Sequence, residues 1–123
     1  MTDKIRYLDA AGRHLEYAWW GGPPASGEMA LVFLHEGLGC VDMWRDVPET
    51  LADLTGLPAL AYSRAGYGRS EGITLPRAVD YHAPEAYDVL PAVLDAAGIG
   101  AAVLIGHSDG GTIALMAAGR DAR

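Results

Sequence analysis

A glycine-rich turn between two regular segments is the feature that most constrains the fold of this chain. Residues 101–105 form a continuous apolar run, residues 106–111 read Gly-His-Ser-Asp-Gly-Gly, and residues 112–118 are mostly small and apolar. A short apolar run bounded by turn-forming residues is typical of a strand covered on both faces, as in parallel sheets. We therefore predict a buried strand, a tight turn and a helix in direct succession.

Two earlier segments repeat the first part of this pattern. Residues 30–34 and 60–62 are short apolar runs, and glycine-rich turns follow them at 35–39 and 63–70. Strands that alternate with helices through short connections form a mostly parallel sheet with right-handed crossovers. We therefore predict an α/β fold in which a mostly parallel sheet is flanked by helices.

The first strands are expected to form an antiparallel hairpin. Residues 4–8 and 14–20 have strand character, and the turn-forming stretch 9–13 with its glycine separates them. The following stretch, 21–27, is rich in glycine and proline and predicts a loop. The sheet should therefore open with the hairpin before the parallel strands begin.

Two helices are predicted between the strands. Over residues 43–55 the spacings of three and four place four apolar side chains on one helical face: Trp44, Val47, Leu51 and Leu54. Gly56 offers a left-handed stop. The second helix has an apolar face made by Tyr87, Leu90, Leu94 and Ala97. Pro91 should bend or divide that helix, and Gly98 should end it.

Composition limits the classes of partner. The chain has 123 residues, half of them apolar, which suits one domain with a buried core. The net charge of −7 argues against binding nucleic acid, because phosphate neutralisation needs a basic patch. The apolar runs are too short to cross a bilayer, and the charged opening residues do not form a signal peptide. The lone Cys40 cannot form a disulfide within the chain, which fits a reducing compartment. We expect a cytoplasmic protein without membrane partners.

Ser108 is the candidate nucleophile. It lies between Gly106 and Gly110, a spacing typical of a serine presented on a sharp turn between a strand and a helix. A side chain at either glycine would collide with the neighbouring strand or helix. The turn also places the backbone amide of Asp109 at a helix N-terminus, where it can face a developing oxyanion.

Three segments resemble the α/β-hydrolase family. They are the turn His35-Glu36-Gly37-Leu38-Gly39, the turn Gly66-Tyr67-Gly68-Arg69-Ser70, and the turn around Ser108. Glu36 stands where the family usually has glycine, and Ser63 where it often has aspartate. The resemblance implies that the amides of Gly37 and Asp109 form an oxyanion hole. It covers the whole chain but only the first half of a family member, so we expect residues 1–123 to form one incomplete core domain.

The resemblance also implies what this half lacks. The family order of the triad is serine, acid, histidine, and no histidine follows Ser108. We therefore expect a serine hydrolase acting on a small carboxylic ester or related acyl substrate, with histidine and acid supplied by other sequence and the isolated chain inactive. Family members that hydrolyse epoxides or haloalkanes have aspartate at the nucleophile position. The alternative is an inactive fragment or interaction module that associates with itself or with a complementing C-terminal chain.

No cofactor or metal is expected. Residues 37–42 lack the third glycine of a dinucleotide loop, and His35-Glu36 has no second histidine at the spacing of a zinc site. We expect His35 and His107 to shape their turns by hydrogen bonding rather than act as bases. Glu36 is either a substrate or water contact or a solvated loop residue, and Cys40 is expected to be an unreactive thiol.

Overall fold

Five strands form one mixed sheet. The computed structural model describes residues 5–25, 28–73 and 80–120. The strand order is β1-β2-β4-β3-β5, with bounds β1 Arg6–Ala10, β2 Arg13–Trp20, β3 Met29–Leu34, β4 Ala59–Tyr62 and β5 Ala101–Gly106. Strands β4, β3 and β5 run parallel, while β2 is antiparallel to both β1 and β4. The predicted α/β class and the opening hairpin are confirmed.

The hairpin turn is shorter than expected. Strand β1 extends to Ala10 and β2 begins at Arg13, so that only Ala11 and Gly12 form the turn, with φ of 51° and 76°. A two-residue turn with both φ values positive matches the twist of the paired strands. Of the predicted first strand, residue 4 lies outside the described residues.

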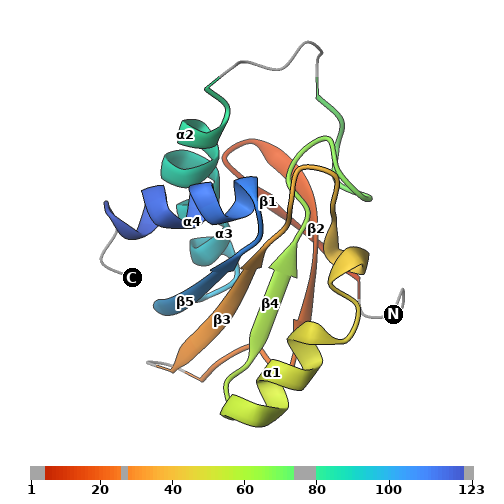
Figure 1. The fold of residues 1–123 in the computed structure, drawn as a ribbon, viewed down its shortest axis with the longest axis vertical. Coiled ribbons are helices and arrows are strands. Elements are labelled where there is room, and N and C mark those ends of the chain that lie inside the picture. Colours follow the sequence, from red (N-terminus) through yellow and green to blue (C-terminus); the bar gives the residue numbers. More distant parts are fainter. Residues whose placement is uncertain (1–4, 26–27, 74–79, 121–123) are drawn as a thin grey trace.

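Helices cover both faces of the sheet (Figure 1). Alternate residues of β3 point to opposite sides: Val32 and Leu34 pack in one core cluster, and Leu31 and Phe33 in the other. The first cluster contains residues of α3 (Leu90–Ala96) and α4 (Asp109–Ala118), and the second contains Leu51 of α1 (Val47–Thr55). Coverage on both faces explains why the parallel strands read as continuous apolar runs.

The predicted helix over 43–55 is wrong in its first part. Residues Val41–Trp44 form a short 3₁₀ turn, η2, and Arg45 then takes a φ of 56°, so α1 begins only at Val47 with Pro48 in its first turn. Proline suits the first turn of a helix because the missing N–H has no partner there. The predicted stop is confirmed, since Gly56 has a φ of 74°. The proposed apolar face is also wrong, because Val47 and Leu54 are exposed.

The next helix is divided next to Pro91, as predicted. A short α2 (His82–Pro84) leads into a π-helical turn, η3 (Glu85–Val89), and then into α3. The amide of Leu90 donates to the carbonyl of Glu85, five residues earlier. Proline cannot continue the ordinary hydrogen-bond ladder, and π turns are one way in which a helix accommodates an interruption. Gly98 ends the helix with a φ of 75°.

Candidate active site

Ser108 lies at the junction between β5 and α4, at one end of the sheet (Figure 1). Its φ and ψ are 56° and −120°, a conformation that residues with a side chain rarely adopt. The residue is exposed, and its carbonyl accepts hydrogen bonds from the amides of Gly111 and Thr112, which begin the helix. A strained backbone therefore presents this side chain to solvent.

The two flanking glycines are required by close packing. A Cβ atom at Gly106 would overlap the backbone of Gly110, and one at Gly110 would overlap the carbonyl oxygens of Leu34 and His35. The structure thus confirms that a side chain at Gly106 or Gly110 would collide with neighbouring backbone, as predicted. The start of α4 therefore packs so closely on the ends of β3 and β5 that neither glycine position has room for a side chain.

The turn after β3 lies directly beside the turn that holds Ser108. A Cβ atom on Gly37 would sit 3.5 Å from Oδ2 of Asp109, so the structure places Gly37 beside the Asp109 side chain. His35 shapes this turn: its Nδ1 donates to the carbonyl of Glu36 at 2.7 Å, and its Nε2 accepts from the amide of Arg64 at 3.0 Å. These contacts hold the His35 ring between the turn after β3 and the turn after β4.

Arg64 and Tyr81 are site residues that sequence reasoning missed. The Nη2 atom of Arg64 donates to Oδ1 and Oδ2 of Asp109 at 3.0 and 3.1 Å, and the Tyr81 hydroxyl donates to Oδ2 at 2.6 Å. The side chains of Arg64 and Asp109 are only 2% and 11% exposed. For Arg64 the available signal was a charged residue two positions after the buried strand β4, because a buried charge needs a partner.

These contacts shift the ionisation of both acidic groups. Burial raises the pKa of the Asp109 carboxyl, but the hydrogen bonds from Tyr81 and Arg64, together with the Arg64 charge, outweigh burial and hold that pKa below its usual value. The hydrogen bond to Asp109, with a smaller effect of burial, raises the pKa of Tyr81. Asp109 is therefore a carboxylate at neutral pH.

A second buried carboxylate supports the turn at 66–70. Glu16 of β2 is fully buried and accepts from the Ser63 hydroxyl at 2.6 Å and from Nη1 of Arg69 at 3.2 Å. The Ser63 hydroxyl in turn accepts from the amide of Val41 at 2.9 Å. Gly68 has a φ of 52° and packs against the Glu16 carboxylate, so this turn has no space for a side chain there. Sequence reasoning also missed Glu16, whose signal was a carboxylate inside an apolar strand.

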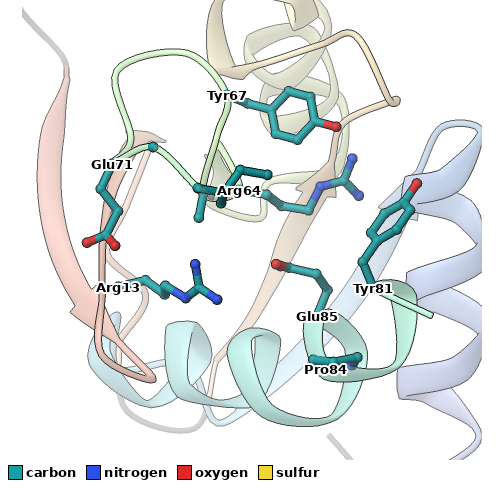
Figure 2. A pocket seen from close by; sticks show the side chains of 10 residues that line it. Arg13, Arg64, Tyr67, Glu71, Tyr81, Pro84 and Glu85 are labelled. Atoms are coloured by element: carbon teal, nitrogen blue, oxygen red, sulfur yellow. The ribbon is translucent and has the colours of Figure 1, made fainter. Parts of the chain in front are cut away.

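Two cavities lie near these turns. The larger, of about 450 Å³, contains none of the predicted site residues in its described lining (Figure 2): Arg13, Arg64, Ala65, Tyr67, Glu71, Gly72, Ile73, Tyr81, Pro84 and Glu85. The smaller, of about 100 Å³, is lined by Glu36 and His107, the neighbours of Gly37 and Ser108 in sequence, together with His35, Gly39, Cys40, Met43 and Trp44. Glu36 is half-buried there, which is compatible with either role expected for it.

Within the described ranges, no group of three or more histidine, cysteine, aspartate or glutamate residues is arranged to hold a metal ion. In the same ranges, no helix has the length and apolar character needed to span a bilayer.

Comparisons with known proteins address the fold. The family model described as the alpha/beta hydrolase fold matches residues 30–122. No curated protein sequence matches the chain significantly. Solved structures do: an epoxide hydrolase from Vigna radiata has a TM-score of 0.75 and 22% identity over 95% of this chain. An alpha/beta hydrolase fold protein from Chitinophaga pinensis has a TM-score of 0.77 and 22% identity over 96%.

A bacterial membrane phospholipase A is similar in the same way, with a TM-score of 0.79 and 20% identity over 96% of this chain. This chain spans 34%, 40% and 36% of these three structures, respectively. Identities this low show the fold, which agrees with the family match. The chain belongs to the α/β-hydrolase fold family.

Proposed function

We propose that this chain carries the nucleophile half of a serine hydrolase that acts on a carboxylic ester or related acyl substrate. Ser108 Oγ would attack the acyl carbon, the alcohol would leave, and the amides of Gly37 and Asp109 would bind the oxyanion. The base that takes the serine proton is a histidine, oriented by an acid, both supplied by sequence outside the described residues. The observation that supports this proposal is the strained, exposed conformation of Ser108 ahead of α4.

Serine chemistry is favoured over epoxide hydrolysis. Epoxide hydrolases are among the structures of similar fold. Family members that hydrolyse epoxides have aspartate at the nucleophile position, whereas this chain has Ser108 there. A carboxylate and a hydroxyl form different covalent intermediates, so the residue at the turn decides between the two reactions.

A fluorophosphonate probe tests the proposal. We expect Ser108 to be labelled once the chain is complemented by a C-terminal segment that supplies the histidine and the acid, with labelling lost in Ser108→Ala and the labelled residue identified by peptide mass spectrometry. The isolated chain should stay unlabelled, because it lacks the base. Ser108→Ala changes one exposed atom and should retain the circular dichroism spectrum of the parent chain. Labelling that persists in Ser108→Ala, or a complemented chain that is never labelled, would contradict the proposal.

A second candidate function is an interaction module completed by another chain. Among the described strands, β5 pairs only with β3, and Val103 on it is 42% exposed. A strand edge of this kind can template pairing with further polypeptide. Sedimentation velocity at increasing concentration tests this role, since self-association that is equal in the parent chain and Ser108→Ala would support it.

A further inference from the structure

The oxyanion hole proposed above has a negatively charged neighbour. The Asp109 side chain lies against Gly37, with Oδ2 3.5 Å from the position that a Cβ on Gly37 would take. The same carboxylate belongs to the residue whose own amide is the second proposed donor. Like charges close together in a partly buried site repel strongly, because the local dielectric is low. An uncompensated carboxylate here would oppose the negative charge that the hole must accept.

Arg64 is placed to cancel that charge. Its Nη2 contacts both oxygens of Asp109 at 3.0 and 3.1 Å, and the pair is almost completely buried. Among the described residues, no hydrogen-bond partner is found for Nε or Nη1 of Arg64, and both atoms are sealed from solvent. The guanidinium group also lies 5.4 Å from the centre of the Tyr67 ring, on its face. Burying a cation with two N–H groups unpaired costs free energy of desolvation. A neutral hydrogen-bond donor could orient Asp109 without that cost, but it could not cancel the negative charge of the carboxylate.

We propose that Arg64 is a charge-compensating positioning residue, which neutralises the Asp109 carboxylate so that the neighbouring amides can stabilise an oxyanion formed at Ser108. This inference rests on the proposed function. In this proposal Arg64 acts through Asp109, to which both of its shortest side-chain contacts are made. Tyr81 orients the same carboxylate without changing its charge, since its hydroxyl donates to Oδ2 at 2.6 Å.

The test measures how fast Ser108 reacts with an uncharged fluorophosphonate when the chain is complemented by a C-terminal segment that supplies the histidine and the acid. In that reaction the Oγ–P bond forms, the P–F bond breaks, fluoride leaves with its electron pair, and the hydroxyl proton passes to the histidine of the complementing segment. Negative charge develops on the phosphoryl oxygen, so the maximal rate reports on the hole. Dependence on probe concentration separates that rate from the binding of the probe.

The variants separate charge from structure. Arg64→Gln keeps a donor for Asp109 and removes the cation, and we expect its maximal rate to fall at least tenfold with little change in probe binding. Arg64→Gln/Asp109→Asn removes both charges and should recover to within about threefold of the parent. Arg64→Lys should retain more of the rate than Arg64→Gln. Arg6→Gln, which removes an exposed arginine on β1, is the matched control for a change in net charge. Thermal unfolding of every variant identifies losses of stability.

The outcomes distinguish the two proposals. A labelled parent chain with an undiminished Arg64→Gln, or with a double variant as slow as Arg64→Gln, overturns the charge-compensation proposal and leaves Ser108 as the nucleophile. If Arg64→Gln does not fold, the comparison of Arg64→Lys with the double variant decides, because a merely structural arginine predicts that the double variant stays slow. A complemented parent chain as unreactive as complemented Ser108→Ala overturns both proposals.

Discussion

The guanidinium group of Arg64, which follows β4, forms a buried ion pair with the carboxylate of Asp109, the first residue of α4, at 3.0 Å. This contact joins two turns that are 45 residues apart in sequence. It therefore ties the orientation of the residue after Ser108 to the end of a different strand. Stability, pH dependence and reactivity at this turn should all depend on that contact.

The first prediction concerns acid. The pKa of Asp109 is held below its usual value in the folded state, so folding disfavours protonation of this group. Its contribution to stability is fully present above the unfolded pKa, about 3.9, and is lost as the pH falls through the lower folded value. We expect the melting temperature of the parent chain to fall more steeply than that of Asp109→Asn below about pH 4. Circular dichroism melts from pH 7 to pH 2 measure this, with the exposed Asp53→Asn as control.

The second prediction concerns two adjacent glycines of α4. A Cβ on Gly110 would overlap the carbonyl oxygens of Leu34 and His35, whereas one on Gly111 would lie 3.6 Å from the nearest such atom. Gly110→Ala should therefore destabilise the chain by several kcal/mol, at the upper end of about 1–3 kcal/mol for overpacking or beyond it. Gly111→Ala should stabilise it by about 0.5–1 kcal/mol, because alanine is the better helix former. Urea unfolding compares the two, and equal effects would contradict the packing described for the turn.

The third prediction concerns the strain at Ser108. A residue held at a φ of 56° and a ψ of −120° costs about 1–3 kcal/mol, and glycine avoids that cost while losing about 0.5–1 kcal/mol of chain entropy. We expect Ser108→Gly to be about 1 kcal/mol more stable than Ser108→Ala. Both variants lack the hydroxyl, so the difference isolates the backbone. Chemical unfolding monitored by tryptophan fluorescence checks it, and a less stable Ser108→Gly would argue against strain.

The fourth prediction concerns the buried carboxylate of β2. Glu16→Ala leaves the Ser63 hydroxyl without its acceptor and opens space against Gly68, so a loss of about 2–3 kcal/mol is expected. Glu16→Gln keeps an acceptor oxygen of the same shape and should lose less. Equilibrium unfolding in guanidinium chloride measures both, with the exposed Glu49→Ala as control. Equal losses for the two Glu16 variants would show that the acceptor is not what matters.

The fifth prediction concerns the hairpin turn. Ala11 is exposed and has a φ of 51°, which favours asparagine or glycine over alanine. Ala11→Asn should raise the free energy of unfolding by about 0.5–1 kcal/mol, and Ala11→Val should lower it, because branching at Cβ is incompatible with positive φ. Thermal melts compare the two variants at one surface position. A stabilising valine would contradict the turn geometry.

Local sequence signals predicted most of the fold. Apolar runs indicated the three parallel strands, and strand character on both sides of a glycine-containing turn indicated the two hairpin strands. Gly56 and Gly98 indicated two helix ends, and all of these features depend on neighbouring residues alone. The helix over 43–55 failed for a physical reason. Apolar spacing continued through Arg45, but the backbone there takes a positive φ, and the side chains counted as an apolar face at Val47 and Leu54 lie on the surface. The spacing of apolar residues can indicate a helical face, but it does not show whether another element packs against that face.

The sequence by itself determined the strand, turn and helix around Ser108, since glycines at 106 and 110 leave few other conformations for that segment. Only the tertiary structure decided which charged groups meet there. The pairing of Arg64 with Asp109, and of Glu16 with Ser63, depends on which strands lie next to one another in the sheet. Residues that meet because their strands are neighbours in the sheet show no pattern of spacing along the sequence. Their contacts can therefore be identified only from the folded structure.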